Sequence, residues 1–586
     1  MFWYALVLLK YYFWGTCIWL LFQIDYRNKV PEQGFYNRCG VSSRFNFDNW
    51  AKTVLTKTPT VFPKNDDELR KYLNLIKLNG CKARPVGDTH SQPALVAQES
   101  DLNTVAISLA NYIPDDTTWR SVIFQESGVN YIRIPAGRTL LDLQSIIRPR
   151  NLYTPTQTAG FIFSIGGIMA NPIHGGYYNK GFFNYYGRKF RVMKADGGIK
   201  VIEDPEEIKY WRQSFGLLGI ITAVEMELEE RTDVTMELYS NSFASRSISK
   251  TDVDNFILDI KKNGEIYSEI FLNPYSLELA TIVVKNNPGD KPTSDAGCTY
   301  DYHQATCSPA SFCYYELKFG DTSLDDSCRL KTVENLKTFY DSYKAAFPEL
   351  NIKGIATSVF PGDYYGGELA DILYLTARNP TLSDSIVTAK VLAELTMLTT
   401  SALIKGANKE VCDGYWIRSI TQAFFISYWF PVDKTYDALM AYLNLSWALY
   451  DGVHPKLNQY TNYKFNQPMG WRYATLNADK ASKYQIPSTP GDYVIFDVVI
   501  LNNEMEDYKW AFAQLEEDWL KIPGATPHLA KPFGFTFNGS NIPQPYSTSF
   551  ANNLMSASQK ADFKTYQALV DPTELFFAGY ATEFFK

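Results

Sequence analysis

The chain has 586 residues, of which 46% are apolar and 20% are charged, and its formal net charge is −7. A chain of this length is too long for one compact core, so two or three domains are expected. The balance of apolar and charged residues indicates a globular protein, and the negative net charge argues against nucleic acid as the main partner. Aromatic side chains are abundant, with 40 Tyr, 37 Phe and 12 Trp. This abundance suits large apolar pockets as well as dense cores.

Residues 1–24 form an apolar stretch with a single charge, Lys10. As a helix they would span about 36 Å at about 1.5 Å per residue, which is enough to cross a bilayer core of about 30 Å. The stretch lacks the basic start and the small residues that precede the cut in a secretory signal peptide. An uncleaved membrane anchor is therefore favoured, with a cleaved signal as the alternative. Arg27 and Lys29 follow the span, and charge bias alone would keep the body of the protein cytoplasmic.

Four of the eight cysteines lie in one polar, loop-like segment, at Cys298, Cys307, Cys313 and Cys328. An even number in such a segment predicts disulfides and an oxidising compartment. The spacings match no zinc pattern, so no metal site is predicted although His303 lies nearby. Glycosylation sequons begin at Asn444 and Asn538, which agrees with a lumenal body. We therefore predict a membrane-anchored or secreted protein of the secretory pathway.

The first predicted element is a helix over residues 65–80. Asn65 and Glu68 form a capping-box pair, apolar residues recur at helical spacing, and Gly80 supplies the stop. A short strand then leads into residues 84–91, which read RPVGDTHS. Beyond it, the segments 104–112 and 131–137 have the pattern of strands, and the segment 139–150 has that of a helix. This alternation predicts a mixed α and β domain.

Glycines gather in residues 163–187, where six of them occur beside an isolated histidine, His174. So dense a set indicates a backbone that turns sharply or approaches something closely. Residues 214–230 follow, with a Gly-x-x-Gly step that runs into an alternating strand. Neither glycine segment fits the dinucleotide fingerprint or the Walker P-loop. Longer strands and helices begin after about residue 235, where we predict a domain boundary.

Five segments of the chain resemble, in order, the FAD-binding domain of the vanillyl-alcohol oxidase superfamily. They read RPVGDTHS, IRIPAGRTLLDL, TPTQTAGFIFSIGGIMANPIHGG, KADGGIK and FGLLGIITAVEMEL, and the resemblance covers about residues 55–232. It implies that the first loop lays its backbone amides around the FAD pyrophosphate. The second glycine segment would run beside the flavin, and the Gly-x-x-Gly step would contact the rest of the cofactor. The implied cofactor-binding residues are Pro85, Val86, Gly87, Asp88, Thr89, His90, Ser91, Ser164, Gly166, Gly167, Asn171, His174, Gly216, Gly219, Ile220 and Ile221.

His90 stands where many members of that superfamily carry a histidine bonded covalently to the flavin. The resemblance therefore implies FAD as cofactor, with His90 as the candidate for a covalent link. The alternative is a hydrogen-bonding role for His90 beside a noncovalent FAD. This chain has Asp88-Thr89 where the family has a small residue and a glycine. Thr89 is expected to restrict the backbone conformations open to the loop. The negative charge of Asp88 is unfavourable near a pyrophosphate unless its side chain points away.

The C-terminal half resembles the sugar-lactone oxidases of the same superfamily. Four segments carry this resemblance: a cap strand and helix, a Glu-x-Arg strand, a Pro-His-Trp-x-Lys motif and a terminal segment. In this chain they are residues 423–443, 468–482, 524–535 and 571–585.

Three residues of these segments are candidate catalytic residues. Arg472 and Lys531 would face the flavin as cations that stabilise negative charge, and His528 would hold or orient the site. Gly470 stands where the family has a glutamate. This replacement is expected to widen the site and to favour a larger, more apolar alcohol.

The resemblance implies an α+β fold, with a two-subdomain PCMH-type FAD-binding domain and a cap domain whose antiparallel sheet is flanked by helices. The predicted parts are a hydrophobic segment, the FAD-binding domain, a substrate-binding cap with a Cys-rich insertion at 298–328, and a C-terminal segment that returns to the FAD domain. Their ranges are 1–24, 31–235, 236–500 and 501–586.

The predicted function is that of an FAD-dependent oxidase. It would pass hydride from a secondary alcohol, in the manner of a sugar-lactone oxidase, to flavin N5, with dioxygen as the electron acceptor. The alternatives are an oxidase of a sterol or another apolar alcohol, a dehydrogenase with a different acceptor, and a flavin-binding protein that has lost catalysis.

Overall fold

The computed structural model describes residues 35–287 and 424–586. Short gaps lie within these ranges at 37, 44, 50, 52, 99–100, 148–149, 157, 159–162, 178, 231–232, 263–264, 462, 466 and 501–505. The predicted membrane segment 1–24 and the cysteines from Cys298 to Cys328 lie outside the described residues. Among the described helices, none combines the length and the apolar character needed to span a bilayer.

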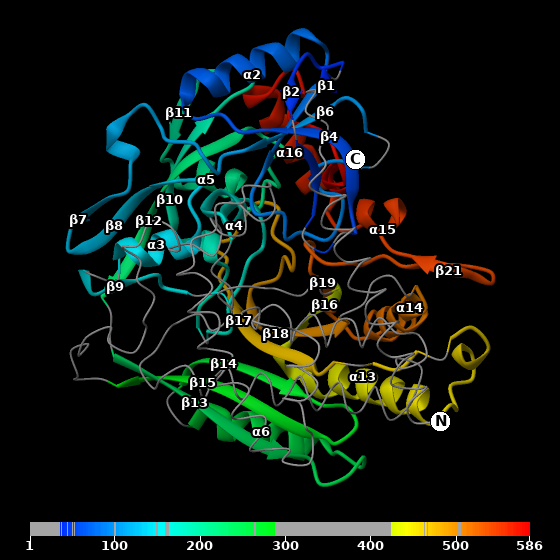
Figure 1. Cartoon of the computed structure of the whole chain (residues 1–586). Coiled ribbons are helices and arrows are strands. Elements are labelled where there is room, and N and C mark those ends of the chain that lie inside the picture. The colour runs from blue at the N-terminus through cyan, green and yellow to red at the C-terminus, as the bar shows by residue number, and fades with distance from the viewer. Residues whose placement is uncertain are drawn as a thin grey trace, which may run out of the picture.

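The smaller sheet of the N-terminal half has the strand order β3-β4-β6-β5, in which β6 is parallel to both of its neighbours (Figure 1). Its strands are Phe45–Asp48, Leu55–Val61, Thr104–Ser108 and Lys82–Val86. Helix α2 (Asp66–Leu78) precedes β5, in agreement with the predicted helix. Asn65 caps this helix by accepting the Glu68 N–H, but the Glu68 carboxylate accepts the Lys64 N–H instead. Only half of the predicted capping box therefore forms.

The larger sheet of this half has the order β11-β10-β12-β8-β7, and β9 also pairs with β12. All of these pairs are antiparallel. In the order just given, its strands are Ile199–Ile202, Gly187–Met193, Ile220–Glu230, Val129–Pro135 and Val122–Glu126, with β9 at Leu152–Tyr153. Around it lie α3 (Leu140–Ile147), α4 (Ile165–Ala170), α5 (Pro205–Trp211), η1 (Thr117–Trp119) and η3 (Phe183–Tyr186). A separate pair joins β1 (Phe35–Tyr36) to β2 (Ser42–Ser43).

The burial of β12 differs from the alternation expected from its sequence. Every residue from Ile220 to Met226 is buried. Strand β12 is central, with β10 on one side, β8 on the other and α4 packed against it. A strand that is covered on both faces is buried continuously, whatever the alternation of its polar residues. Glu225, for example, is buried between Arg133 and Arg188.

The cap is one antiparallel sheet of seven strands in the order β13-β15-β14-β17-β18-β16-β19. In that order the strands are Asp233–Ser242, Glu278–Asn287, Glu265–Leu272, Met469–Leu476, Gly491–Ile500, Phe424–Pro431 and Thr526–Pro527. Helices α6 (Lys250–Lys262), α13 (Thr435–Tyr450) and α14 (Tyr508–Trp519) share one apolar core with this sheet. Figure 1 shows α6 and α13 on the side of the sheet that faces away from the N-terminal half. The opposite face of the sheet is thereby turned toward that half.

The end of the chain packs against the N-terminal half. Helix α16 (Ala557–Val570) and the final turn η6 (Tyr580–Phe585) contribute Phe563, Phe584 and Phe585 to its core. The remaining short elements are η4 (Val432–Lys434), η5 (Leu457–Gln459), the hairpin of β20 (Thr536–Asn538) and β21 (Asn541–Gln544), and α15 (Thr548–Asn552). The predicted domain boundaries stay predictions.

A disulfide joins Cys39 to Cys81, whose Cα atoms are 5.7 Å apart. Sequence analysis did not single out this pair, because the two cysteines are 42 residues apart and lie in no common motif. Disulfides persist in oxidising compartments. The bond therefore agrees with the predicted secretory route, which stays a prediction.

A buried ion pair connects α2 to the larger sheet. Both nitrogens of the Arg191 fork donate to the carboxylate of Asp66, at 2.9 and 2.7 Å, and both side chains are almost completely buried. Asp66 also accepts from the Tyr112 hydroxyl and from the Asp115 N–H. Although burial opposes its charged form, these donors keep the pKa of Asp66 below its usual value.

We predict that Asp66→Asn lowers the free energy of unfolding by about 3–5 kcal/mol, because it leaves the Arg191 guanidinium buried without a counter-charge. Urea denaturation followed by fluorescence measures this loss. The control is Lys250→Ala, which removes an exposed pair with Asp254 and should leave stability nearly unchanged. Equal effects of the two substitutions would show that the buried pair does not stabilise the contact between α2 and the larger sheet.

Candidate active site

A cavity lies where the loops of the N-terminal half face the cap sheet. Every cofactor-binding residue implied by the resemblance lines it except Ile220, which is buried at the start of β12. The three candidate catalytic residues, Arg472, His528 and Lys531, line the same cavity from the cap side. The structure therefore brings together two sets of residues that lie hundreds of positions apart in the chain.

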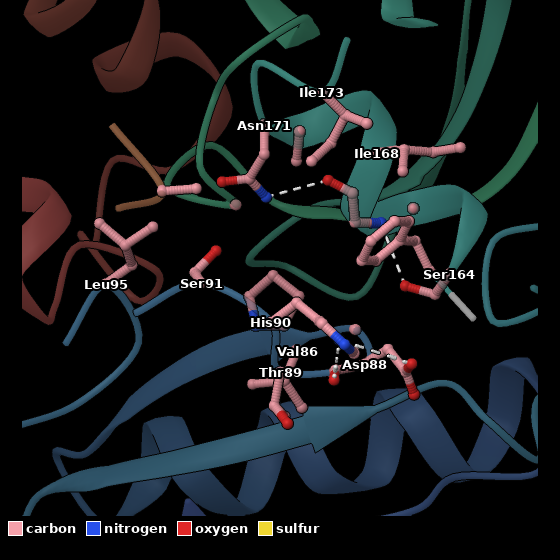
Figure 2. Close-up of a pocket in the computed structure, with 18 of the residues that line it drawn as sticks. Val86, Asp88, Thr89, His90, Ser91, Leu95, Ser164, Ile168, Asn171 and Ile173 are labelled. Atoms are coloured by element: carbon pink, nitrogen blue, oxygen red, sulfur yellow. Dashed lines mark hydrogen bonds and ion pairs between the residues drawn. The ribbon is translucent and has the colours of Figure 1, made fainter. Parts of the chain in front are cut away.

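The first loop and helix α4 approach each other through glycine. A Cβ atom on Gly87 would lie 2.2 Å from Ser164 Oγ and 3.5 Å from Gly167 Cα. Ser164 caps α4, since its Oγ accepts the Gly167 N–H at 3.3 Å (Figure 2). The segment expected to be a glycine loop is thus partly helical, because a serine cap starts a turn whose glycines pack against the first loop. Gly216 also approaches the first loop closely, since a Cβ on Gly216 would lie 2.6 Å from Pro85 Cγ.

His90 and its neighbours form a compact turn at the edge of the cavity. Thr89 has φ of +59°, a left-handed conformation that costs about 1–2 kcal/mol in a residue with a Cβ. His90 Nδ1 donates to the Asp88 carbonyl at 3.0 Å, and the Asp88 carboxylate lies 3.7 Å from the same nitrogen. Figure 2 shows the Asp88 side chain beside the His90 ring. The edge of the ring contacts Phe163, with the ring centroids 4.9 Å apart.

Asn171 presents a buried acceptor to the cavity. Its amide nitrogen donates to the Gly167 carbonyl at 2.9 Å (Figure 2). Its Oδ1 is buried and has no partner among the described residues. Buried polar atoms are almost always paired, so this oxygen indicates a ligand that donates a hydrogen bond here.

The cap contributes a charged cluster from its central strands. Arg472 on β17 donates to the carboxylate of Asp497 on β18, and its Nε lies 3.8 Å from Glu269 Oε1 on β14. Ser427 on β16 donates to the other oxygen of Asp497. Burial opposes the charged form of Asp497, but the cations Arg472 and Lys531 and the hydrogen bond from Ser427 hold its pKa well below the usual range. Asp497 is therefore ionised.

The Asp497 side chain lies beside Gly470. The glycine is directly opposite Asp497 in the β17–β18 register. A Cβ on Gly470 would lie 3.4 Å from Asp497 Cβ and 3.9 Å from its Oδ2, which is ordinary contact. Asp497 thus borders the position where the family has a glutamate, and the expected widening of the site stays a prediction.

The two histidines of the cavity are neutral. His174 Nδ1 donates to the Gly175 carbonyl at 2.9 Å, so its Nε2 has a free electron pair. His528 Nδ1 accepts from the Ala530 N–H at 3.2 Å, so its Nε2 carries the proton. Burial first, and nearby cations second, lower the pKa of His174 well below its ordinary value and that of His528 to about 3. Their ring centroids are 5.3 Å apart, and both pack against Trp429.

Lys531 is the second cation of the cap side. Burial, and to a smaller extent Arg472, lower its pKa to about 8 against the opposing effect of Asp497. Its Nζ lies 4.0 Å from the centre of the Phe425 ring, which is a favourable cation–π contact.

Sequence reasoning missed several residues that complete the site. Asp497 and Glu269 belong to no motif, and Ser427 lies in the cap segment 423–443 without having been marked as a site residue. Only the register of the cap strands brings these side chains to Arg472. Gln92 was also missed, although it follows the His90 loop directly. Its N–H donates to the Ala530 carbonyl at 2.9 Å, and its Oε1 accepts the Phe425 N–H at 3.1 Å. Gln92 therefore ties the first loop to both the cap strand β16 and the Lys531 loop.

These residues fit FAD. The glycine cradle of Gly87 and Gly167 allows backbone to approach a pyrophosphate, and the unpaired Asn171 oxygen can accept from a donor on the flavin ring. Arg472 and Lys531 would face the negative charge of a reduced flavin. Among the described residues, no group of three or more His, Cys, Asp or Glu side chains is arranged to hold a metal ion.

Comparison with known families agrees with this assignment. Residues 59–203 match the family model described as an FAD binding domain. The chain therefore contains an FAD-binding domain, as predicted. A comparison with curated proteins finds no match.

Solved structures with a similar fold include cholesterol oxidases. A solvent-stable cholesterol oxidase has a TM-score of 0.60 at 15% identity, with 90% of this chain and 95% of that chain covered. Cholesterol oxidase from B. sterolicum has a TM-score of 0.58 at 13% identity, with 92% of this chain and 96% of that chain covered. A histidine-to-alanine variant of the Brevibacterium sterolicum enzyme has a TM-score of 0.59 at 13% identity, with 92% of this chain and 96% of that chain covered.

At these identities the likeness concerns the fold. It confirms the predicted architecture of a PCMH-type FAD-binding domain with a cap, and with it the resemblance to the vanillyl-alcohol oxidase superfamily. The sugar-lactone-oxidase resemblance stays a prediction.

We predict that Gly87→Ala weakens FAD binding about fivefold, because the new methyl group displaces Ser164 Oγ and removes a helix cap that contributes about 1 kcal/mol. FAD is titrated into flavin-free protein in a His90→Ala background, so that binding stays reversible. The double variant Gly87→Ala with Ser164→Gly removes the clashing oxygen. It should bind FAD at least as well as Gly87→Ala alone. Unchanged affinity in Gly87→Ala would contradict the close approach.

Proposed function

We propose that this protein is an FAD-dependent oxidase that acts on the CH–OH group of an apolar secondary alcohol. One observation carries the proposal: Arg472, Lys531 and the neutral pair His174 and His528 line the same cavity as the glycine cradle. Cations and a hydrogen-bond acceptor therefore lie beside the place where the resemblance puts the flavin. Bound FAD would supply the hydride acceptor at flavin N5.

The side chains of the cavity have separate tasks in this proposal. His174 Nε2 is the unprotonated nitrogen of a neutral ring, so it accepts the hydrogen bond of the substrate hydroxyl and orients it. Arg472 and Lys531 are already desolvated and fixed, so they stabilise negative charge without reorganising. The Gln92 hydrogen bonds hold the loop of Lys531 against the first loop, which keeps the two sides of the cavity in register.

Aromatic residues favour an apolar substrate. Phe163 lines the cavity and contacts His90, and Phe425 on β16 contacts Lys531. The similar solved structures are titled cholesterol oxidases, which supports a sterol-like alcohol over a sugar lactone. Dioxygen is the proposed electron acceptor, and formation of hydrogen peroxide during turnover distinguishes it from the acceptor of a dehydrogenase.

We predict that Arg472→Met reduces the rate of flavin reduction about 100- to 1000-fold, the usual cost of losing one preorganised donor. FAD binding should survive, because the glycine cradle lies in the other domain. Stopped-flow absorbance with a panel from sugar lactones to sterols measures the rate. The wild-type rate should also fall as the pH rises through about 8, where the Lys531 cation is lost.

The control for this prediction is Arg246→Met, which removes an exposed pair with Asp451 and should leave the rate unchanged. If Arg472→Met is as fast as wild type with every active substrate, the assigned role of Arg472 is wrong. If no alcohol reduces even the wild-type flavin, the protein is a flavin-binding protein without this catalysis.

We also propose that FAD is bonded covalently through His90, which lines the cavity in a fixed orientation. Acid precipitation of the native protein should leave the yellow colour in the pellet. His90→Ala should release the flavin into the supernatant, whereas His454→Ala, on the cap, should retain it in the pellet. Complete release from the wild-type protein would refute the covalent bond and leave a noncovalent FAD.

A further inference from the structure

The Arg472 guanidinium reaches the cavity from a strand that offers it no acidic neighbour of its own. Two positions earlier on the same face of β17 stands Gly470, which has no side chain. The acids come from the flanking strands instead. Glu269 lies directly opposite Arg472 on β14, and Asp497 lies directly opposite Gly470 on β18. Residues directly opposite in an antiparallel pair point to the same face, so Gly470, Arg472 and Asp497 share one patch of the sheet.

Asp497 is held from two sides. One carboxylate oxygen accepts from Ser427 on β16, and the other accepts from Arg472 on β17. The side chain is buried, with 4% of the residue exposed. Both oxygens are occupied by protein donors, so this carboxylate is placed to orient a neighbour and not to take a proton from substrate.

A side chain at position 470 would lie against Asp497. A Cβ on Gly470 would make ordinary contact with Asp497, at 3.4 Å from its Cβ. A longer acidic side chain at 470 would bring a second negative charge against the carboxylate, and like charges directly opposite each other destabilise a sheet. This pair of positions therefore accommodates one carboxylate.

We propose that Asp497 is the positioning residue for Arg472, and that β17 and β18 form an exchangeable pair in which either position 470 or position 497 can supply the carboxylate that accepts from Arg472. This inference rests on the proposed function only in assigning Arg472 to face the flavin. It concerns the specific acid that fixes the catalytic cation, which no motif in the sequence marks.

The test is a mutational cycle on the FAD-loaded full-length protein. Asp497→Ala should slow flavin reduction about 100-fold, comparable to the loss of one fixed donor, because Arg472 loses the carboxylate that accepts its hydrogen bond. Gly470→Glu should also slow it, because two carboxylates then oppose each other. The double variant Gly470→Glu with Asp497→Ala should recover to within about tenfold of wild type and exceed both single variants, since sites in contact are not additive.

Two readouts do not depend on turnover. The midpoint temperature of unfolding and the reduction potential of the bound flavin should move away from wild type in each single variant and return toward it in the double variant. If no alcohol reduces the wild-type flavin, the proposed function fails, but these two readouts still decide this inference. The matched control is Asp492→Ala, an exposed aspartate on the same strand that accepts from Thr475, which should change neither readout.

Asp497→Asn provides a second variant in case Asp497→Ala does not fold. It keeps hydrogen-bonding capacity toward Ser427 and Arg472 but removes the charge. Lys531 is faced by Asp497, by Arg472 and by His528. Loss of the one negative group should lower the pKa of Lys531, so the alkaline fall of the rate should move to lower pH.

Wild-type behaviour of both Asp497→Ala and Asp497→Asn would overturn the positioning role. A double variant no better than Asp497→Ala would overturn the exchange, because a carboxylate at 470 would then not replace the one at 497.

Discussion

The cavity depends on two backbone segments that meet without side chains between them. Gly87 follows strand β5 and Gly167 lies in helix α4, and Ser164 Oγ fills the narrow space beside both. A single added methyl group would separate the loop from the helix. Since the loop continues to His90 and the helix leads to His174, this contact positions both the proposed attachment site and the proposed hydrogen-bond acceptor for the substrate.

Opposite this cradle, the cap places charges where water is scarce. Removing charge from water is costly, and a buried charge persists only with partners. Asp497 stays ionised because cations surround it, whereas burial leaves the histidines neutral and lowers the pKa of Lys531. The same desolvation that costs stability makes these groups effective, because fixed charges in a dry site need no rearrangement when a reaction creates charge. Desolvation is therefore the reason both for the stability that the cluster costs and for its proposed use in the reaction.

Contacts between distant parts of the chain keep the two sides in place. Gln92 connects the first loop to β16 and to the Lys531 loop. Arg84, which is completely buried, donates to the carbonyls of Gly216 and Phe576 at 2.9 Å each. The second of these contacts joins residues 492 positions apart. The last segment of the chain is therefore part of the support of the cofactor loop.

The sequence by itself determined the features that depend on near neighbours. It predicted helix α2, the strands that precede and follow the first loop and the order of the FAD-binding segments, and all but one of the site residues that it named line the cavity. Capping residues, glycine-rich turns and short motifs act over a few positions, so they can be read without the fold. For the same reason Arg472, His528 and Lys531 could be chosen as candidates from their motifs alone.

Only the tertiary structure decided which groups those candidates meet. Arg472 and Asp497 are 25 residues apart, and they pair because β17 and β18 align in one register. A shift of one residue would turn Asp497 to the other face of the sheet. Likewise, the sequence marked the absence of a glutamate at 470, but the carboxylate that borders this position comes from a neighbouring strand. Strand register, the continuous burial of β12 and the Cys39–Cys81 bond all depend on pairings between distant segments, which local patterns do not specify.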